Sequence, residues 1–272
     1  MKINKRTFLN GALASAIAVT LLAPRLMAAT AIDPDADRIF RACCKYLADA
    51  KGFSVKVEVW KDVVVSTGQK IQTTRTLEVQ EHRPDQLRIE VRSPRDSKGF
   101  WYQKNSLTML DRNMNLYGVM EVPENIDKAF DAVEERFGLE IPLGDVLVAD
   151  PYRNMMDNTE TAEDLGKVTT LGTVCNHLAF TGVNADCQIW IADGPKPLPR
   201  KIVINFKTIA GSPQVTQIYS DWDLVSPISD SVFTFVPPDG ASKIVVNPKK
   251  AEDDSDAAPA ESPKPATEPA KK

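Results

Sequence analysis

Apolar and polar residues alternate along most of the chain between residues 53 and 236. In residues 53–59, one phenylalanine and three valines occupy every second position. A period of two is typical of a β-strand that buries one face. The pattern predicts about ten or eleven strands, at 53–59, 77–79, 87–91, 100–102, 107–110, 116–120, 174–181, 188–192, 201–207, 215–223 and 232–236.

The linkers between many of these strands are short and rich in turn residues. Residues 66–68 read Ser-Thr-Gly, and residues 84–85 read Pro-Asp. Serial hairpins of this kind indicate an up-and-down antiparallel sheet. So many strands are too many for a flat open sheet, so the sheet is expected to curl.

Helical spacing is confined to a few segments. Residues 34–50 place apolar side chains three and four positions apart, and Asp33 precedes them as a candidate N-cap. Residues 125–137 repeat the pattern, and two short helices are expected at 143–148 and 151–156. The predicted class is therefore mainly β (α+β), a single curved antiparallel sheet interrupted by a helical insert.

Residues 1–31 have the layout of an export signal. Lys2, Lys5 and Arg6 precede an apolar stretch, and Ala29-Thr30-Ala31 supplies small residues for cleavage. The pair Lys5-Arg6 leaves the general secretory route and a twin-arginine-like route both open. We expect cleavage and a periplasmic location; an uncleaved anchor helix is the alternative reading.

The last segment, 249–272, contains no Val, Ile, Leu or aromatic residue. Such a composition cannot bury enough apolar area to offset the entropy of ordering, so a disordered tail is predicted. The predicted organisation is a signal at 1–31, one domain at 32–248 and the tail.

Composition excludes several classes of function. The net charge is −4 and no basic cluster occurs in the body, which argues against a nucleic-acid partner. The chain has only two histidines, His82 and His177, and lacks the common zinc-hydrolase, serine-hydrolase, P-loop and dinucleotide motifs. No metal, cofactor or catalytic residue is therefore predicted, and the protein is expected not to be an enzyme.

Two polar groupings are candidate chemical sites. His177 could act as a base beside Asp186, but a hydrogen-bonded structural role on a strand is favoured. Asp221 and Asp223 flank Trp222, so both carboxylates share one strand face. A calcium site or an acid–base pair is conceivable there, but a solvated outer face is the stronger interpretation.

The four cysteines leave one pairing open. Cys43 and Cys44 are adjacent on a predicted helix and point about 100° apart, so they cannot easily bridge. Cys175 and Cys187 lie on the two arms of a predicted hairpin. A turn at 182–184 would place a residue near 191 opposite Cys175, so a Cys175–Cys187 disulfide needs a different register or a wide bulge.

Several motifs together resemble a bacterial family. They are Gly99-Phe100-Trp101-Tyr102, Leu107-Thr108-Met109-Leu110-Asp111, Ile141-Pro142-Leu143-Gly144-Asp145-Val146-Leu147, Cys175-Asn176-His177-Leu178-Ala179-Phe180, Pro197-Leu198-Pro199-Arg200-Lys201 and Phe233-Thr234-Phe235-Val236-Pro237-Pro238. From about residue 35 to 245 the chain resembles the predicted periplasmic proteins of domain-of-unknown-function family 2092, itself similar to the LolA, LolB and LppX lipoprotein-carrier fold.

The resemblance implies a half-open sheet whose concave face is covered by helices, with a hydrophobic cavity between the two. A carrier of a lipid, an acyl chain or a lipidated protein is then expected, monomeric and with envelope proteins as further partners. The alternative is a non-catalytic envelope module whose core is filled by its own side chains. Either sheet face could line a cavity, and the candidate lining residues are Trp101, Trp60, Val57, Ile89, Phe130, Trp190 and Ile204.

Overall fold

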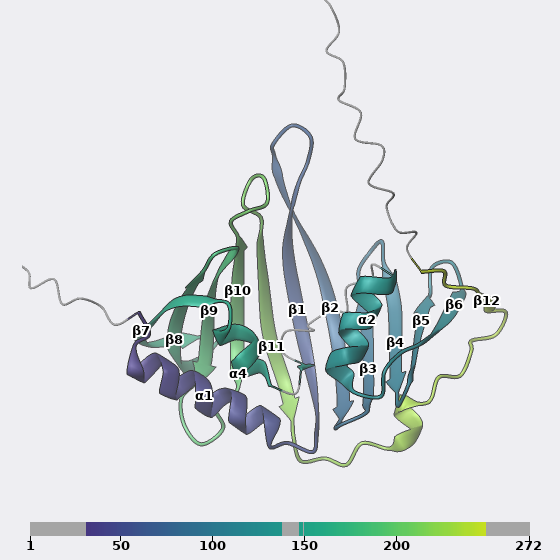
Figure 1. The fold of residues 1–272 in the computed structure, drawn as a ribbon, viewed down its shortest axis with the longest axis horizontal. Coiled ribbons are helices and arrows are strands. Elements are labelled where there is room, and N and C mark those ends of the chain that lie inside the picture. Colours follow the sequence, from purple (N-terminus) through teal and green to yellow (C-terminus); the bar gives the residue numbers. More distant parts are fainter. Residues whose placement is uncertain (1–30, 138–146, 149, 249–272) are drawn as a thin grey trace, which may run out of the picture.

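One large sheet forms the body of the protein. The computed structural model describes residues 31–137, 147–148 and 150–248 (Figure 1). Within these residues, twelve strands form a single open, curved sheet in the order β12-β6-β5-β4-β3-β2-β1-β11-β10-β9-β8-β7. The predicted class, a mainly β protein built on one curved sheet, is confirmed.

The strands are long in the centre of the sheet and short at one edge. They are β1 (Gly52–Val64), β2 (Lys70–His82), β3 (Gln86–Arg92), β4 (Ser97–Gln103), β5 (Ser106–Asp111), β6 (Leu116–Glu121), β7 (Thr159–Thr170), β8 (Thr173–Gly182), β9 (Ala185–Ala192), β10 (Pro199–Phe206), β11 (Gln214–Asp223) and β12 (Ser242–Ile244). The strands β1 to β6 and β7 to β11 are two series of hairpins, and pairing of β1 with β11 joins them.

One strand departs from the predicted antiparallel pattern. The strand β12 runs parallel to β6, whereas the other neighbouring strands are antiparallel. A hairpin cannot produce a parallel pair, and here the chain travels from β11 to the far edge of the sheet before forming β12.

In the described part of the chain, three α-helices lie on one face of the sheet (Figure 1): α1 (Pro34–Ala48), α2 (Ile126–Phe137) and α4 (Pro151–Met156). Asp33 caps α1 as predicted, because its carboxylate accepts the backbone N–H of Asp35 at 2.7 Å. The helix α4 begins in the same way, with the Asp150 carboxylate accepting the Arg153 N–H at 2.9 Å. The helix predicted at 143–148 lies largely outside the described residues, as do 1–30 and 249–272.

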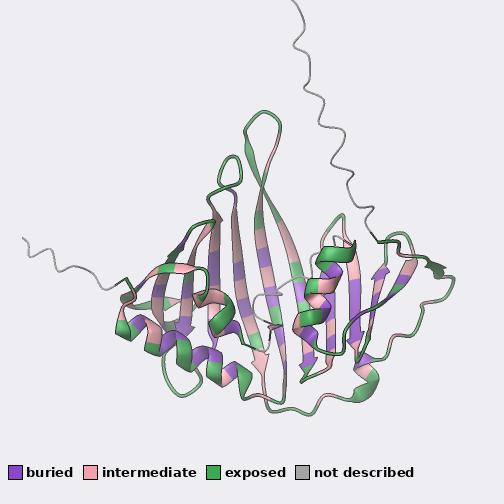
Figure 2. Cartoon of the chain, viewed as in Figure 1, coloured by how far each residue is buried: buried purple, intermediate pink, exposed green. Residues whose placement is uncertain are grey.

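Strand side chains alternate between a helical face, which packs against the helices, and an outer face. Val57 is opposite both Leu77 on β2 and Tyr219 on β11. These three residues belong to the same buried cluster as the apolar residues of α1 and α2. Figure 2 shows the alternation of buried and less buried positions along the strands. The helical face therefore carries the main core.

Two strand assignments differ from the sequence prediction. Residues 232–236 are not a strand: Asp230–Phe233 form a 3₁₀ helix, η1, and the chain continues in irregular form. The strand β7 was missed, because at the edge of the sheet most of its positions are exposed or intermediate and polar residues are tolerated on both faces. The short β12 was missed as well.

A C-terminal segment, residues 230–246, covers part of the outer face, and we call it the strap. Phe233 is buried and stacks on His82 at 6.4 Å between ring centroids. Phe235 packs on Trp101 at 4.9 Å and on Tyr117 at 5.1 Å. The strap therefore gives the β3–β6 part of the sheet a second apolar layer.

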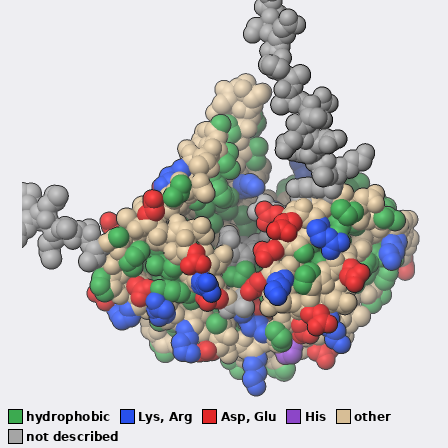
Figure 3. Space-filling model, in the orientation of Figure 1, with side chains coloured by type: hydrophobic (Ala, Val, Ile, Leu, Met, Phe, Trp, Pro, Cys, Tyr) green, Lys and Arg blue, Asp and Glu red, His purple; other side chains and the backbone are tan. Residues whose placement is uncertain are grey.

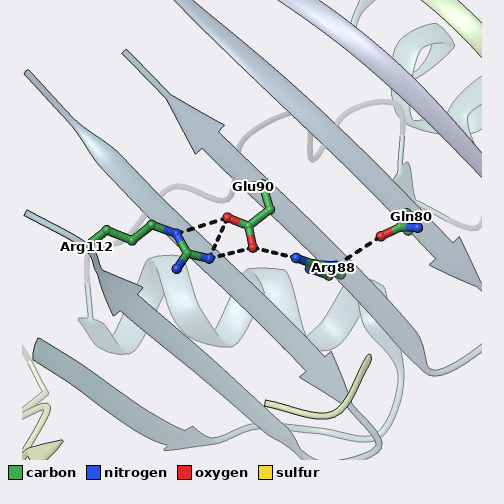
Figure 4. Close-up of polar contacts among 4 residues, drawn as sticks. All are labelled: Gln80, Arg88, Glu90 and Arg112. Carbon is green, nitrogen blue, oxygen red and sulfur yellow. Dashed lines mark hydrogen bonds and ion pairs between the residues drawn. The ribbon is translucent and has the colours of Figure 1, made fainter. Parts of the chain in front are cut away.

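A buried carboxylate lies beside this second layer. Glu90 on β3 is only 3% exposed and accepts hydrogen bonds from Arg112 at 2.7 Å and from Arg88 at 2.9 Å (Figure 4). Each guanidinium lies 5.7 Å from the centre of the Trp101 ring. Gly99 makes room for that ring, because a Cβ there would lie 2.4 Å from the indole. The charge is thus buried only because two cations compensate it.

Candidate ligand-binding cavity

A cavity of about 520 Å³ lies between α1, α4 and the strands β8 to β11. The sheet forms the floor of the cavity, because every second side chain of a strand points toward it. The pairing of β10 with β9 places Ile202 opposite Ile189 and Ile204 opposite Cys187. The walls come from α1 and α4. The apolar lining includes Phe40, Cys43, Leu47, Met155, Phe180, Ile189, Ile202, Ile204 and Phe206.

Aromatic contacts hold α1 near one edge of the sheet. Phe40 packs on Phe180 of β8 at 5.1 Å and on Tyr152 of α4 at 5.8 Å. The Arg41 guanidinium lies 4.0 Å above the Tyr152 ring and pairs with Asp37. The main contacts of α1 are accordingly with β7, β8 and α4. Side chains of β9 and β10 therefore face a space that α1 borders but does not fill.

The rim of the cavity is polar. The segment from α4 to the start of β7 contributes Asn154, Asp157, Asn158 and Glu160. The end of β8 contributes Thr181, and the turn between β8 and β9 contributes Asn184. These six residues are exposed. An apolar interior with a polar mouth is the usual composition of a small-molecule site.

Glycine allows two parts of the rim to meet. A Cβ on Gly182, at the end of β8, would lie 2.4 Å from the carbonyl oxygen of Asn158. Only a residue without a side chain permits this approach of the β8 end to the segment that follows α4.

The cavity thiols belong to the apolar wall. Burial raises the pKa of the Cys43 thiol well above its usual value, and it raises the pKa of Cys44 to about 12. Both thiols are therefore protonated at neutral pH. Because the thiolate is the reactive and metal-binding form, neither residue is suited to nucleophilic or ligating chemistry here.

One buried polar side chain reaches the floor. Gln217 of β11 lines the cavity and is largely buried. The Tyr219 hydroxyl donates a hydrogen bond to its side-chain oxygen. The amide therefore has a partner within the protein, and its presence does not by itself require a polar ligand group.

Among the candidate lining residues, only Ile204 borders the cavity. Val57 and Ile89 lie on the helical face, but both are fully packed in the core under the other half of the sheet. Phe130 of α2 is partly buried against the same core. These three residues therefore share the predicted face without reaching the space.

The three candidate tryptophans, Trp101, Trp190 and Trp60, lie on the outer face of the sheet, opposite the cavity. Trp101 lies under Phe235 of the strap. Trp190 stacks on His177 at 4.1 Å and carries Lys201 at 4.6 Å. Trp60 pairs with Thr216 on β11 and directly follows the core residue Val59 on β1, so its side chain points to the outer face. The suggestion that these tryptophans line a cavity is wrong for the cavity beneath α1 and α4.

The Cys175–Cys187 bridge, which the sequence left open, does not form. Register places Cys175 opposite Ala192 and Cys187 opposite Phe180, and no disulfide forms. Cys187 is five positions from Ala192 along β9, which corresponds to roughly 16 Å and to the opposite sheet face. A disulfide requires Cα atoms less than about 7 Å apart.

The two polar groupings singled out from the sequence have structural partners. The His177 ring nitrogen Nε2 lies 3.0 Å from the Gln188 side-chain oxygen, and Asp186 pairs with Lys207 at 2.9 Å. Asp221 pairs with Lys56 at 3.0 Å. Hydrogen bonds from the Ser226 side chain and from the backbone N–H groups of Ser226 and Val225, both N–H groups at 2.9 Å, hold the pKa of the Asp223 carboxyl at about 2. Neither grouping forms an acid–base pair.

No other chemical centre stands out among the described residues. No group of three or more His, Cys, Asp or Glu side chains is placed to hold a metal ion within the part of the chain that the structure describes. Within the same residues, no helix has the length and apolar character needed to cross a bilayer.

Sequence reasoning missed most of the lining. Phe40, Cys43 and Leu47 lie on the apolar stripe of α1, so their inward orientation could be read from helical spacing. Met155 and the β8–β9 turn gave no such signal. Their place depends on α4 folding back over the sheet, which no local pattern specifies.

The protein is an open curved sheet with helices on one face. It belongs to the class of β-rich proteins that enclose a ligand-sized apolar cavity between sheet and helices. The family comparison is more specific. The family model described as "Predicted periplasmic protein (DUF2092)" matches residues 36–247, and the chain belongs to this family. The resemblance stated from the sequence motifs is thereby confirmed.

Solved structures supply remote similarities. An uncharacterized conserved protein from Thermus thermophilus matches with a TM-score of 0.47 and 9% identity, covering 78% of this chain and 99% of that one. LprF from Mycobacterium bovis matches at 0.42 and 14%, covering 72% and 96%. The LolA superfamily protein NE2245 from Nitrosomonas europaea matches at 0.40 and 11%, covering 74% and 97%. No curated protein matches the chain.

Proposed function

We propose that this protein is a periplasmic, non-catalytic carrier that binds an acyl chain of a lipid or a lipidated protein in the cavity between α1, α4 and β8–β11. The observation that carries the proposal is an apolar space of about 520 Å³ with a polar mouth. Ligand sites commonly have volumes of about 300–1,000 Å³, so the space is large enough for part of a small lipid.

Apolar burial supplies the driving force. Each methylene removed from water contributes about 0.8 kcal/mol, so ten buried methylenes give roughly 8 kcal/mol before the costs of association. The floor residues Ile189, Ile202 and Ile204 offer only aliphatic surface. A chain can therefore be held without a charged contact.

Export accords with this proposal. The family is described as periplasmic, and residues 1–31 have the layout of a signal. Free acyl chains are insoluble in the aqueous periplasm, and a protein that encloses them needs donor and acceptor partners in the envelope. We propose that the chain works as a monomer with such partners.

The competing proposal is an envelope module with a self-filled core. One observation favours it: beneath α2, the side chains of Leu87, Ile89 and Val133 are fully packed in the core. The cavity beneath α1 favours the carrier. The two proposals therefore differ in whether that cavity is occupied by a ligand.

The first test is direct. Protein purified from the periplasm is extracted with organic solvent, and the extract is analysed by mass spectrometry. A carrier releases a lipid in near-stoichiometric amount. Delipidated protein should then bind a fluorescent acyl probe, and unlabelled lipid should displace it.

Variants of adjacent residues on β10 provide the matched control. Ile204→Trp places an indole in the cavity, whereas Asn205→Trp adds the same group to the other face of the strand. We expect Ile204→Trp to weaken probe binding about tenfold or more and Asn205→Trp to leave it unchanged. No extracted lipid and no probe binding by the wild type would refute the carrier function.

A further inference from the structure

The charge distribution at the mouth of the cavity limits which lipids can enter. We propose that the cavity selects acyl chains that end in an uncharged group, such as an ester, an amide or an alcohol, over free fatty acids. This inference rests on the proposed carrier function and specifies its ligand class. It depends on the side chains at the rim and on the ion pairs around them.

The rim offers negative charge and no positive charge. Asp157 and Glu160 are the carboxylates among the described lining residues, and that lining includes no Lys or Arg. Asp157 lies 3.5 Å from Arg153, but both side chains are strongly exposed, so solvent screens the pair. An incoming carboxylate therefore meets like charge at the mouth.

The cations of α1 pair with carboxylates on or next to their own helix and lie outside the cavity lining. Arg41 pairs with Asp37 at 3.2 Å, and Lys45 pairs with Asp49 at 2.8 Å. Arg38 pairs with Asp35 at 2.8 Å in the same way. None of these three cations is among the residues that line the cavity.

Cations on the neighbouring strands lie toward the outer face. Lys201 sits over Trp190 there, at 4.6 Å from the ring centre. Lys207 pairs with Asp186 at 2.9 Å. A fatty-acid carboxylate at the mouth would therefore find no cation among these groups.

The rim is better suited to an uncharged head group. Asn154, Asn158 and Asn184 carry side-chain amides, which combine donors with an acceptor. Esters and alcohols can exchange hydrogen bonds with such groups, while a carboxylate requires donors alone. Moving a carboxylate toward the apolar interior without a cation also costs its hydration.

The test compares two twelve-carbon probes below their micellar concentrations. The probes are monolaurin, an uncharged glycerol ester, and laurate, the corresponding carboxylate. Each displaces a fluorescent acyl probe from the delipidated mature protein at pH 8. We expect monolaurin to bind at least about tenfold more tightly than laurate.

A charge-changing variant assigns the selectivity to the rim. The double variant Asp157→Asn with Glu160→Gln removes both rim carboxylates and keeps the three rim asparagines. We expect laurate affinity to rise about tenfold while monolaurin affinity stays constant. Asn205→Lys, on the other sheet face, is the control and should change neither. Circular dichroism confirms that each variant is folded.

The outcomes separate the two claims. Equal binding of laurate and monolaurin by the wild type would overturn the head-group selectivity and leave the carrier function standing. A selectivity that the rim variant does not alter would overturn the assignment to these residues. Binding of neither probe would overturn the carrier function and the selectivity together.

Discussion

The two halves of the sheet have the same alternating strand pattern but differ in how their helical faces are packed. Beneath α2, the helical face of β1 to β6 is filled by side chains, and the outer face has a second layer under the strap. Beneath α1 and α4, the helical face of β8 to β11 borders a cavity of about 520 Å³. We call these the filled half and the cavity half.

The difference lies in how the helices are attached. The segment leading into α2 is held over β4, because the Tyr102 hydroxyl donates to the carbonyl oxygens of Pro123 and Glu124. Val133 and Ala129 then reach the core. The helix α1 is held at the β7–β8 edge through Phe40. A short amphipathic helix covers only the strands it lies on, so its position decides whether an apolar face is filled.

On the face drawn in Figure 3, surface charge does not distinguish the halves. Figure 3 shows cationic and anionic side chains scattered over the visible face, and apolar groups between them. The contrast therefore concerns packing, and the following predictions measure it.

The largest effect is expected at the strap. Phe233 is 1% exposed, and Phe233→Ala should lower the free energy of unfolding by about 3–5 kcal/mol, because a large buried ring is lost from the filled half. Chemical denaturation measures the change. Val236→Ala, in the same strap but 75% exposed, should cost less than about 0.5 kcal/mol. A loss from Phe233→Ala as small as that from Val236→Ala would show that the strap does not stabilise the sheet.

A matched pair of isoleucines compares the halves directly. Ile89 is 0% exposed in the filled half, and Ile89→Ala should cost about 2–5 kcal/mol. Ile204 already borders an open space, so Ile204→Ala removes fewer contacts and should cost only about 1 kcal/mol. Urea denaturation of the ligand-free protein gives both values. Equal costs would mean that the cavity half is as tightly packed as the filled half.

A buried carboxyl gives the filled half a pH dependence. Glu81 of β2 is 1% exposed; desolvation raises its pKa from 4.5 to about 7, although Arg83, at 3.1 Å, acts in the opposite direction. Neither Glu81 oxygen has a hydrogen-bond partner among the described residues. The raised pKa means that the folded protein binds this proton more tightly than the unfolded chain does.

The contribution of Glu81 to the free energy of unfolding should therefore be greatest below pH 4.5. It should be lost as the pH rises through 7. The loss should reach up to about 3 kcal/mol, measured as the free energy of unfolding between pH 4.5 and 8. Glu81→Gln should remove this slope. An unchanged slope in the variant would assign the pH dependence to other groups.

The smallest effect is expected just beyond the strap. Deleting residues 249–272 should change the free energy of unfolding by less than about 0.5 kcal/mol, because this segment has no apolar residue larger than Ala, Pro or the alkyl part of Lys. Thermal denaturation compares the truncated and full mature chains. A fall in Tm of several degrees would show that the tail contributes to one of the halves.

Much of the architecture could be predicted from local patterns. Alternation in 53–59 and 87–91 marks strands that the structure contains, and Asp33 before Pro34 marks the start of α1. The edge strand β7 could not be found in this way, since an edge position removes the demand for regular apolar alternation. Residues 232–236 of the strap were wrongly predicted as a strand, because Phe233 and Phe235 alternate as strand residues do.

The site was less predictable than the fold. Phe100, Trp101 and Tyr102 are all large and apolar, so alternation assigns them to two faces without saying which face is covered by helices. Likewise, Cys175 and Cys187 lie on paired strands, but their separation depends on register. Both questions are decided by contacts between residues far apart in the chain.

Local patterns along the chain specify a curled sheet with few helices, because the hydrophobic period of each segment acts over a few residues and sets its local conformation. Contacts between distant residues hold α1 at the β7–β8 edge, place the strap over Trp101 and leave a space above Ile204. A cavity is the difference between the volume that a fold encloses and the volume that its side chains occupy, and neither volume belongs to any single segment.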